Sequence, residues 1–391
     1  MDIKLLKEDD YLDSLRLSEY AFQYNVPEDK IPARLENLKS HKLLGIRNGS
    51  SLAAKLHIIP LAVSMNGAVW RMGGIAGVAA YPEYRRSGYV KSLIIAALSQ
   101  MQEDGQIVSL LAPFDFVFYR KFGWEILSDR KKVIIEKMNL KFLSPQPGII
   151  RRYSKAAHQS EIEDIYQKYC ENYTGLLFRD TKWWKEHVYD DNSQMAVYYN
   201  TLKEAIGYIL YNIKDRKMDI QEMAALNQEA REGLWNFICQ HDSMVENVTV
   251  TTSVHDPFPY YLNQPKLKTE IMPYFMCRIV NVKECLERFS FNRGSEPIFL
   301  HIEDHFALWN NGTYLVGNDE VKEYKAKQGS QCVNPPKRGI RLSINELSTI
   351  LFGYKRPCEL YNMGLIKGSK QDVDQFETMI PQMKSAFYDF F

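Results

Sequence analysis

The stretch from Ile75 to Lys91 limits what this chain can fold into more than any other part of its sequence. It begins with small and apolar residues that predict a strand, which ends at Pro82. Arg85, Arg86 and Gly88 follow, and a helical pattern begins directly after them. Backbone N–H groups at a helix N-terminus lack intrahelical partners and carry partial positive charge. The stretch therefore predicts a strand, a cationic turn and a helix in series, an arrangement suited to binding phosphate.

Residues 1–148 predict one mixed α/β unit around this stretch. Asn66-Gly67 lies between two apolar runs and indicates a hairpin, because this dipeptide supplies the positive φ angles of a type I′ turn. After the cationic turn, apolar residues recur at helical spacing from Val90 to Met101. The other expected elements are helices over 4–24 and 116–122 and strands over 42–47, 51–59, 61–65, 68–70 and 107–111. The buried candidates of the first helix are Leu12, Leu15, Tyr20 and Phe22.

Two further units follow, because 391 residues are too many for one ordinary core. The second unit repeats the plan of the first, with helices over 158–173, 181–187 and 229–241 and strands over 194–200, 204–213, 218–225 and 248–252. It has no cationic turn at the equivalent place, so we expect a structural copy that binds no cofactor. The third unit has expected strands over 276–280 and 297–302 and helices over 282–289, 344–352 and 371–387.

Composition places the chain among soluble globular proteins, with 45% apolar residues, 25% charged residues and a net charge of +1. This near-neutral balance gives no sign of a nucleic-acid or membrane surface. No window offers the roughly 20 apolar residues of a membrane span, and the N-terminus lacks the apolar core of a signal peptide. Six cysteines form no C-x-x-C pair, so we expect reduced thiols in a cytoplasmic protein.

A second motif spans Phe118 to Trp124 and reads Phe-Tyr-Arg-Lys-Phe-Gly-Trp. It lies about 30 residues after the cationic turn. A phenol has a reference pKa of about 10 and a thiol one of about 8.5, so Tyr119 could protonate or hydrogen-bond a leaving thiolate at little cost. The alternative is that Tyr119 only packs among its aromatic neighbours, which are Phe114, Phe116, Phe118 and Phe122.

The sequence ends in the aromatic segment Phe387-Tyr-Asp-Phe-Phe391, which would be unfavourable in water. We expect this segment to insert between domains or into a cleft and to bring its α-carboxylate with it. Such a carboxylate has a reference pKa of about 3.3–3.7, and burial would raise the pKa and make the group a better base. Simple core packing is the alternative.

The Arg85–Lys91 loop resembles the (Gln/Arg)-x-x-Gly-x-(Gly/Ala) loop of the GCN5-related N-acetyltransferases (GNAT), which holds the pyrophosphate of acetyl-CoA; Val90 replaces the last small residue. The second motif resembles the Tyr-x-x-Phe-Gly-aromatic segment of the same superfamily, whose tyrosine faces the leaving sulfur of coenzyme A. Together with the aromatic end, these motifs resemble the Eis-like (enhanced intracellular survival) branch, which acetylates aminoglycosides and polyamines.

This resemblance implies mixed α/β sheets and three domains. Residues 1–148 would form a GNAT-like domain that binds the cofactor, residues 149–274 a second GNAT-like domain without cofactor, and residues 275–391 a domain of sterol-carrier-protein fold. It also implies a homo-oligomer, since the family tends to hexamers. By resemblance, Tyr119 acts as general acid and the carboxylate of Phe391 as general base. The implied acetyl-CoA contacts are Val78, Ala79, Ala80, Arg85, Arg86, Ser87, Gly88, Tyr89, Val90, Lys91, Phe114 and Asp115.

Two departures from the family pattern bear on these implications. The segment Pro-Phe-Asp-Phe around Phe114 replaces a Ser-Glu-Gly-like pattern. Phe390 stands where an acidic residue is expected before Phe391, and Asp389 lies one position earlier, which argues against a preference for polycationic aminoglycosides. The residues expected around the acceptor pocket are Phe22, Tyr24 and Trp70.

We therefore expect direct transfer of an acetyl group from acetyl-CoA to a primary amine of an aminoglycoside, a polyamine or a lysine side chain. A backbone N–H near Val78 or Ala79 would polarise the thioester carbonyl. One alternative is a tandem aminoacyl transferase using aminoacyl-tRNA, which the near-neutral charge disfavours; another is a non-enzymatic ligand-binding protein. We expect the third domain to pack its apolar face against the others rather than hold a ligand. His301 and His305 flank a misplaced glutamate, so no metal is expected.

Overall fold

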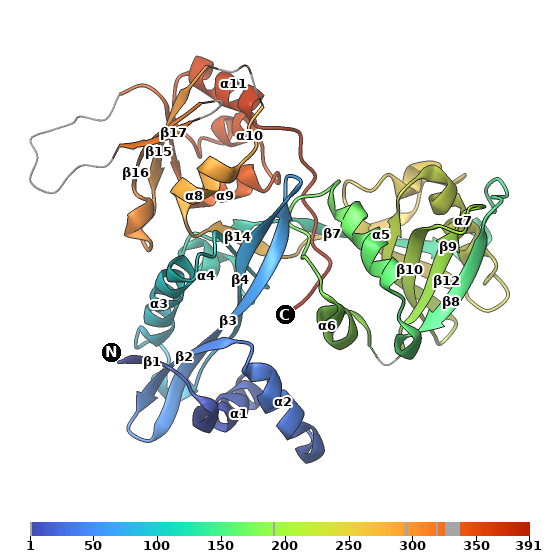
Figure 1. Ribbon diagram of the computed structural model, residues 1–391, viewed down its shortest axis with the longest axis horizontal. Helices are drawn as coiled ribbons and strands as arrows, with labels where there is room; N and C mark the ends of the chain where they lie inside the picture. The colour runs from blue at the N-terminus through green and yellow to red at the C-terminus, as the bar shows by residue number, and fades with distance from the viewer. Residues whose placement is uncertain (1, 191, 293, 295, 318–319, 325–336) are drawn as a thin grey trace, which may run out of the picture.

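The computed structural model describes residues 2–190, 192–292, 294, 296–317, 320–324 and 337–391. These residues form two seven-stranded sheets and one four-stranded sheet. Figure 1 shows three bodies, with the last segment of the sequence running between them. The mixed α/β class expected from the sequence is confirmed.

The first sheet has the strand order β1-β2-β3-β4-β5-β14-β6. Its strands are β1 (Ile3–Leu5), β2 (Lys42–Asn48), β3 (Ser51–Met65), β4 (Ala68–Ala80), β5 (Val108–Leu111), β14 (Met276–Ile279) and β6 (Glu125–Ile126). Its helices are α1 (Tyr11–Phe22), α2 (Ile31–Leu38), α3 (Tyr89–Glu103) and α4 (Phe116–Arg120). Strand β14 pairs with β5 and β6, although it follows the whole second sheet in sequence. The third unit therefore supplies a strand to the first sheet.

The long hairpin of β3 and β4 confirms the predicted turn, with φ angles of 47° at Asn66 and 82° at Gly67. The shorter strands expected on either side merge into continuous strands. Helix α3 confirms the predicted apolar stripe, which packs against one face of this sheet. Its buried residues are Leu93, Ile94, Ala97, Leu98 and Met101.

The opening segment differs from the prediction of one helix over 4–24. Residues 3–5 form β1, and α1 begins at Tyr11. Leu15 is buried as expected, but the other three candidates were wrong. Leu12, Tyr20 and Phe22 are 45%, 56% and 52% exposed.

The reason is that the buried face of α1 is partly polar. Ser14 and Ser18 of α1 are buried and lie opposite Lys55 and His57 of β3. Small hydroxyl side chains fit against these long polar groups where a Leu or Phe would leave them without hydrogen bonds. The apolar pattern alone therefore identified Leu15 but not the polar residues of the buried face.

The second sheet has the strand order β13-β7-β12-β11-β10-β9-β8. Its strands are β7 (Asp129–Glu136), β8 (Ile149–Ser154), β9 (Gln194–Tyr199), β10 (Ala205–Lys214), β11 (Lys217–Ala225), β12 (Asn247–Ser253) and β13 (Lys268–Pro273). Helices α5 (Ser160–Cys170) and α7 (Gln228–Cys239) pack against it, and α6 (Thr181–Trp183) runs on into a π-helix over Trp184–Val188. The four strands predicted from the sequence are β9, β10, β11 and β12, and the structure adds β8 at one edge and β7 and β13 at the other.

The third sheet has the strand order β17-β16-β15-β18. Its strands are β15 (Ile298–Glu303), β16 (Gly312–Val316), β17 (Val321–Tyr324) and β18 (Ile340–Ser343). Its helices are α8 (Val282–Arg288), α9 (Ile344–Leu351), α10 (Pro357–Asn362) and α11 (Lys370–Met379).

The last helix was predicted to run over 371–387, and this is wrong. Helix α11 ends at Met379, and residues 380–391 form an extended tail. Pro381 explains the difference, because proline has no N–H and disfavours a helical conformation at the residue before it. The tail is the segment that reaches the other two bodies (Figure 1).

Every helix within the described ranges is too short or too polar to cross a lipid bilayer. Five cysteines are free thiols, namely Cys170, Cys239, Cys277, Cys285 and Cys358. The sixth, Cys332, lies outside the described residues.

Candidate active site

The cationic turn joins β4 to α3 as the sequence predicted. A single 3-10 turn over Pro82–Tyr84 leads to Arg86, whose φ of 62° is unusual for a residue other than glycine. Gly88 is the N-cap of α3 with a φ of 79°. Both arginines are exposed, so their charges and the first N–H groups of a 15-residue helix face solvent together. The turn has the geometry and charge that a pyrophosphate requires.

Strand β4 opens away from β5 just before this turn. Parallel pairing of β4 with β5 runs from Met72↔Val108 to Ile75↔Leu111 and ends there. Beyond it, β4 continues to Ala80 and pairs with β3 on its other side. The backbone of residues 76–80 therefore faces a gap between two diverging parallel strands, at their carboxyl ends. The predicted contacts Val78, Ala79 and Ala80 lie on this open edge.

A bulge shapes the open part of β4. Lys55 pairs with Ala79 and His57 with Ala76, so two residues of β4 lie opposite the single residue Leu56 of β3. One of the two is Gly77, with a φ of 55° that favours glycine. The bulge interrupts the regular pairing of β4 with β3 around Val78.

Tyr119 lies on α4, which follows β5 after a short loop. Its side chain is 3% exposed, and its ring contacts Phe114, Phe118 and Trp124 at centroid distances of 5.4, 5.1 and 6.3 Å. Burial raises the pKa of the Tyr119 phenol well above its usual range, so the group keeps its proton at neutral pH. Asp115 caps α4 by accepting a hydrogen bond of 2.9 Å from the N–H of Phe118.

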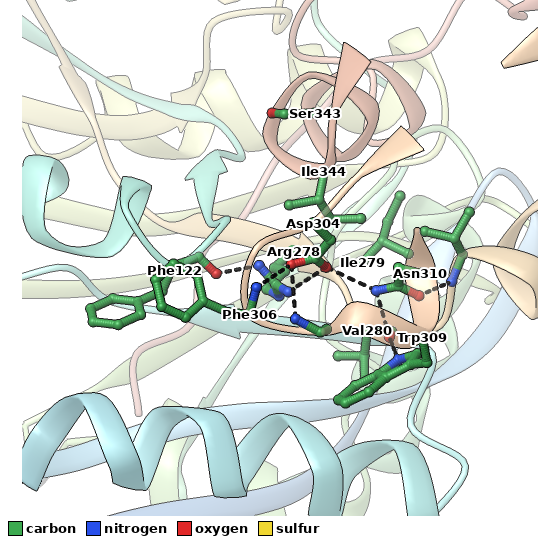
Figure 2. A network of polar contacts seen from close by, with 12 residues as sticks. Phe122, Arg278, Ile279, Val280, Asp304, Phe306, Trp309, Asn310, Ser343 and Ile344 are labelled. Atoms are coloured by element: carbon green, nitrogen blue, oxygen red, sulfur yellow. Dashed lines mark hydrogen bonds and ion pairs between the residues drawn. The ribbon is translucent and has the colours of Figure 1, made fainter. Parts of the chain in front are cut away.

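The third unit fixes the turn that follows Tyr119, as Figure 2 shows. Arg278 of β14 donates to the carbonyl oxygen of Phe122 and forms an ion pair of 2.6 Å with Asp304. Both charged side chains are fully buried. Gly123 has a φ of 93°, and a Cβ at this position would collide with the Arg278 guanidinium. The glycine of the second motif is therefore needed for this contact between units.

The loop of the third unit that contains Asp304, Phe306 and Ala307 also reaches the helix that follows the cationic turn. Backbone N–H groups of Phe306 and Ala307 donate to Asp304, with distances of 3.1 and 3.0 Å, which holds the loop in place. The ring of Phe306 lies 4.9 Å from that of Phe122, and Nζ of Lys91 lies 5.7 Å from the Phe306 centroid. One loop thus contacts the helices that carry both sequence motifs.

The tail over 380–391 is held mainly by the second unit. Thr174 bridges to Ser385, and the N–H of Ala386 donates to the carbonyl of Thr174 at 3.0 Å. Arg130 donates to the carbonyl of Tyr388 at 3.0 Å. These backbone contacts give the tail a defined register, as in an added strand.

Asp389 is the strongest anchor of the tail. Its carboxylate accepts 2.9 and 3.1 Å hydrogen bonds from Nε of Arg179 and a 2.8 Å hydrogen bond from the indole of Trp183. Arg179 also donates to Glu222 at 2.6 Å, and all three charged side chains are buried. Burial raises the pKa of Asp389, and the Arg179 charge opposes this shift. The acidic residue nearest Phe391 is therefore bound inside the protein and does not face an acceptor.

Phe391 lies against β4, in agreement with the expected insertion of the aromatic end. A Cβ at Gly74 would come within 2.7 Å of the Phe391 ring, so only glycine leaves room for it. The ring also contacts Phe275 and Trp183, at centroid distances of 5.2 and 6.4 Å. Phe391 thus contacts β4 at Gly74, two residues before the open edge begins at Ala76.

Two groups on the same hairpin were missed. Lys55 and His57 are buried between β3 and α1, with Nζ 2.8 Å from Nε2 of His57. Two polar residues inside the apolar run Leu-Ala-Ala-Lys-Leu-His-Ile-Ile were the available signal. Of the expected pocket residues, Phe22 is 52% and Tyr24 41% exposed, whereas Trp70 is buried in a hydrophobic core.

Family models match the chain in three places. An acetyltransferase (GNAT) domain model matches residues 2–127, a second acetyltransferase (GNAT) domain model matches residues 175–279, and a sterol carrier protein domain model matches residues 282–388. The expected order of tandem GNAT folds and a sterol-carrier-type fold is confirmed.

Related sequences carry acetyltransferase names. The chain is 24% identical over 287 residues to the N-acetyltransferase Eis of Mycobacterium tuberculosis, which covers 68% of this chain and 70% of that protein. An uncharacterized N-acetyltransferase of Streptomyces griseus is 22% identical over 340 residues, 78% of each chain.

Solved structures share the fold over the whole chain. A protein of unknown function from Enterococcus faecalis, described as a probable N-acyltransferase, superposes with a TM-score of 0.90 at 24% identity and covers 100% of this chain and 99% of that chain. Eis1 from Mycobacterium abscessus superposes with a TM-score of 0.84 at 19% identity and covers 100% of both.

Proposed function

Because this chain is an Eis-like N-acetyltransferase of the GCN5-related superfamily, we propose that it transfers an acetyl group directly from acetyl-CoA to a primary amine of a small molecule. The observation that carries this proposal is the end of β4–β5 pairing at Ile75, directly before a cationic turn and a helix N-terminus. An open strand edge and a phosphate-binding turn are then adjacent. Acetyl-CoA needs both, because its thioester would lie along the strand edge and its pyrophosphate would bind at the turn.

The residues of the first unit would hold acetyl-CoA, which supplies the acetyl group as a thioester. The N–H groups from Gly88 onward, with Arg85 and Arg86, would bind the pyrophosphate. The open edge at Val78 and Ala79 would align the thioester and polarise its carbonyl through a backbone N–H. The second unit carries no such turn between β11 and α7, so we assign all cofactor binding to the first.

Two groups would handle the charges that change during transfer. The α-carboxylate of Phe391 would take a proton from the incoming ammonium, since its ring already lies on β4. Tyr119 would donate a hydrogen bond to the leaving sulfur. Because burial raises the pKa of its phenol, complete proton transfer requires that the same dry surroundings also raise the pKa of the thiolate.

We propose an acceptor with few positive charges. Asp389 is engaged by Arg179 and Trp183, so it leaves no free carboxylate beside Phe391 for a second ammonium group. Among the acceptors expected from the resemblance, a lysine side chain or a simple amine suits this better than a polycationic aminoglycoside. We propose that the protein is cytoplasmic and that its domain limits lie near residues 148 and 274. We also propose that it forms a homo-hexamer, which light scattering on the purified protein tests.

The test is thiol release from acetyl-CoA by the purified protein, against a panel of simple amines, lysine peptides, polyamines and aminoglycosides. We expect amine-dependent release that is fastest with the least charged acceptors. A folded protein that binds acetyl-CoA but releases no thiol with any amine would contradict the proposal and favour a binding role.

A further inference from the structure

Lys55 is a buried amine whose hydrogen-bond partners are both uncharged side chains. Its side chain is 0% exposed, inside an apolar strand. Nζ donates to Oγ of Ser18 at 2.6 Å and lies 2.8 Å from Nε2 of His57. No carboxylate of the described part of the chain is in ion-pair contact with Lys55. Burying an unpaired charge is costly, so such a lysine calls for a functional explanation.

The position of Lys55 places it at the proposed site of transfer. A Cβ on Gly77 would lie 3.1 Å from Nζ of Lys55 and 3.2 Å from the His57 ring. Gly77 directly precedes Val78, which lies on the open edge proposed to align the thioester. The amine and the imidazole therefore lie against the bulge itself.

Lys55 also shares a face of the sheet with Phe391. Side chains alternate along a strand, so Lys55, His57 and Leu61 of β3 point to one face. Both Leu61 and the Phe391 ring approach the Cβ position of Gly74, at 3.1 and 2.7 Å. Gly74 and Gly77 are three residues apart, or roughly 10 Å at the usual strand rise. The two sets of groups thus flank the same stretch of β4.

The groups around Lys55 are neutral or basic. Facing it are Ser18 of α1, His57 of β3 and the backbone of Gly77; Ser14 lies 3.3 Å from Nε2 of His57, and the ring of His41 lies 5.7 Å from that of His57. Farther out, His187 and Lys182 act on His41, and His187 is itself under the charges of Glu186 and Asp389, which oppose those of Arg34 and Lys182.

Burial sets the protonation of this group. It lowers the pKa of Lys55 to about 7 and that of His41 to about 4, and it holds the pKa of His57 well below its usual value. At neutral pH the histidines are neutral, and Lys55 exists both with and without its proton. A base with a pKa close to the working pH is the efficient choice for proton transfer.

We propose that His57 and Lys55 form a relay that takes the proton lost by the acceptor nitrogen when the N–C bond forms. This inference rests on the proposed acetyl transfer. The ammonium gives its first proton to the Phe391 carboxylate. As the amine attacks, its second proton goes to Nδ1 of His57 while the Nε2 proton passes to Nζ of Lys55. The C–S bond breaks, and its electron pair leaves with the sulfur, which Tyr119 hydrogen-bonds.

The test uses the full chain and the best acceptor from the panel. Wild-type kcat should rise through about pH 7, because only neutral Lys55 can accept the proton. In Lys55→Met and His57→Gln, kcat should fall about 10²-fold and lose this rise, while the KM for acetyl-CoA changes little. Lys131→Met is the matched control, because Lys131 is also buried but lies on β7 of the second sheet, where it donates to the carbonyl of Asp256 at 2.9 Å. The kcat and pH profile of this variant should match those of wild type.

The outcomes separate the two proposals. If wild type acetylates an amine and both variants keep its kcat and pH profile, the relay is wrong and the acetyl transfer stands. If both variants lose activity by the same factor at every pH, the pair is structural and the relay is again wrong. If wild type acetylates no amine, the acetyl transfer fails and the relay fails with it. Thermal melts and acetyl-CoA titrations check that each variant is folded. If Lys55→Met is not folded, the His57→Gln variant alone is used for the test.

Discussion

Nε of Arg179 holds the carboxylate of Asp389 at 2.9 and 3.1 Å, two residues before the end of the sequence. This buried contact fixes Phe391 against β4. We predict that Asp389→Ala releases the tail, because it leaves Arg179 with only Glu222 and removes the partner of Trp183. Breaking a buried pair costs about 3–5 kcal/mol, and kcat should fall by at least about tenfold.

The measurement for Asp389→Ala combines kcat with carboxypeptidase digestion followed by mass spectrometry. Asp242→Ala is the control, since it removes a carboxylate from the loop after α7, in the second unit. Wild type and control should resist digestion of the last residues. A variant tail as resistant as that of wild type would show that the backbone contacts at Ser385 and Tyr388 hold it alone.

Tyr119→Phe keeps the buried ring and removes the phenolic proton. We predict that kcat falls about 10²–10⁴-fold while the affinity for acetyl-CoA is retained, as is usual when a proton donor is lost. Tyr84→Phe is a matched control at the edge of the cationic turn. Calorimetric titration and steady-state kinetics provide the two values. Equal kcat in wild type and Tyr119→Phe would reduce this tyrosine to a packing residue.

Gly123→Ala should lower stability more than any glycine substitution at an open turn. The left-handed φ costs about 1 kcal/mol for alanine, and the new Cβ also displaces the buried Arg278 from Phe122. Gly364→Ala is the matched control, with a φ of 74° and no atom within 4 Å of the added Cβ. Denaturant unfolding should show a loss several kcal/mol larger for Gly123→Ala. Comparable losses of unfolding free energy in the two variants would mean that Arg278 and the third unit can move to accommodate the added methyl group.

The pH dependence of stability should report on Lys55 directly. Its pKa is about 7 in the folded protein and about 10.4 in an unfolded chain. Between these values the unfolded state binds more protons, so this group makes the folded state more stable as pH rises, by up to about 1.4 kcal/mol per pH unit. Relative to Lys55→Met, wild type should gain stability from about pH 7 to 10. A constant difference in unfolding free energy would place the Lys55 pKa near its ordinary value.

The sequence was sufficient where local chemistry decides the structure. Asn66-Gly67 makes the predicted hairpin, and the turn at Arg86 and Gly88 begins α3 as expected, because both depend on φ preferences and on short-range periodicity. The aromatic composition of the last residues predicted the burial of Phe387 and the partial burial of Phe391, but Phe390 is 68% exposed. It did not predict an extended tail beyond Pro381.

The failures concern contacts between distant residues. The buried face of α1 follows from Lys55 and His57, which lie some forty residues away in sequence, so periodicity within the helix could not reveal it. The insertion of β14 between β5 and β6 has no local signature, since its four residues are apolar or buried in a pair with Asp304. Family resemblance suggested Tyr119 and Phe391 as site residues, whereas the Lys55 cluster becomes visible only in the folded structure.

The place of β14 in the first sheet also means that this sheet cannot be completed until most of the chain has been synthesised. A growing chain leaves the ribosome from its N-terminus, so β5 and β6 emerge long before the strand that separates them. Until residues 276–279 appear, the edge of β5 is unpaired and open to wrong partners. The first sheet of the nascent chain therefore stays incomplete while the entire second sheet is synthesised. A fragment that ends before β14 should aggregate rather than fold.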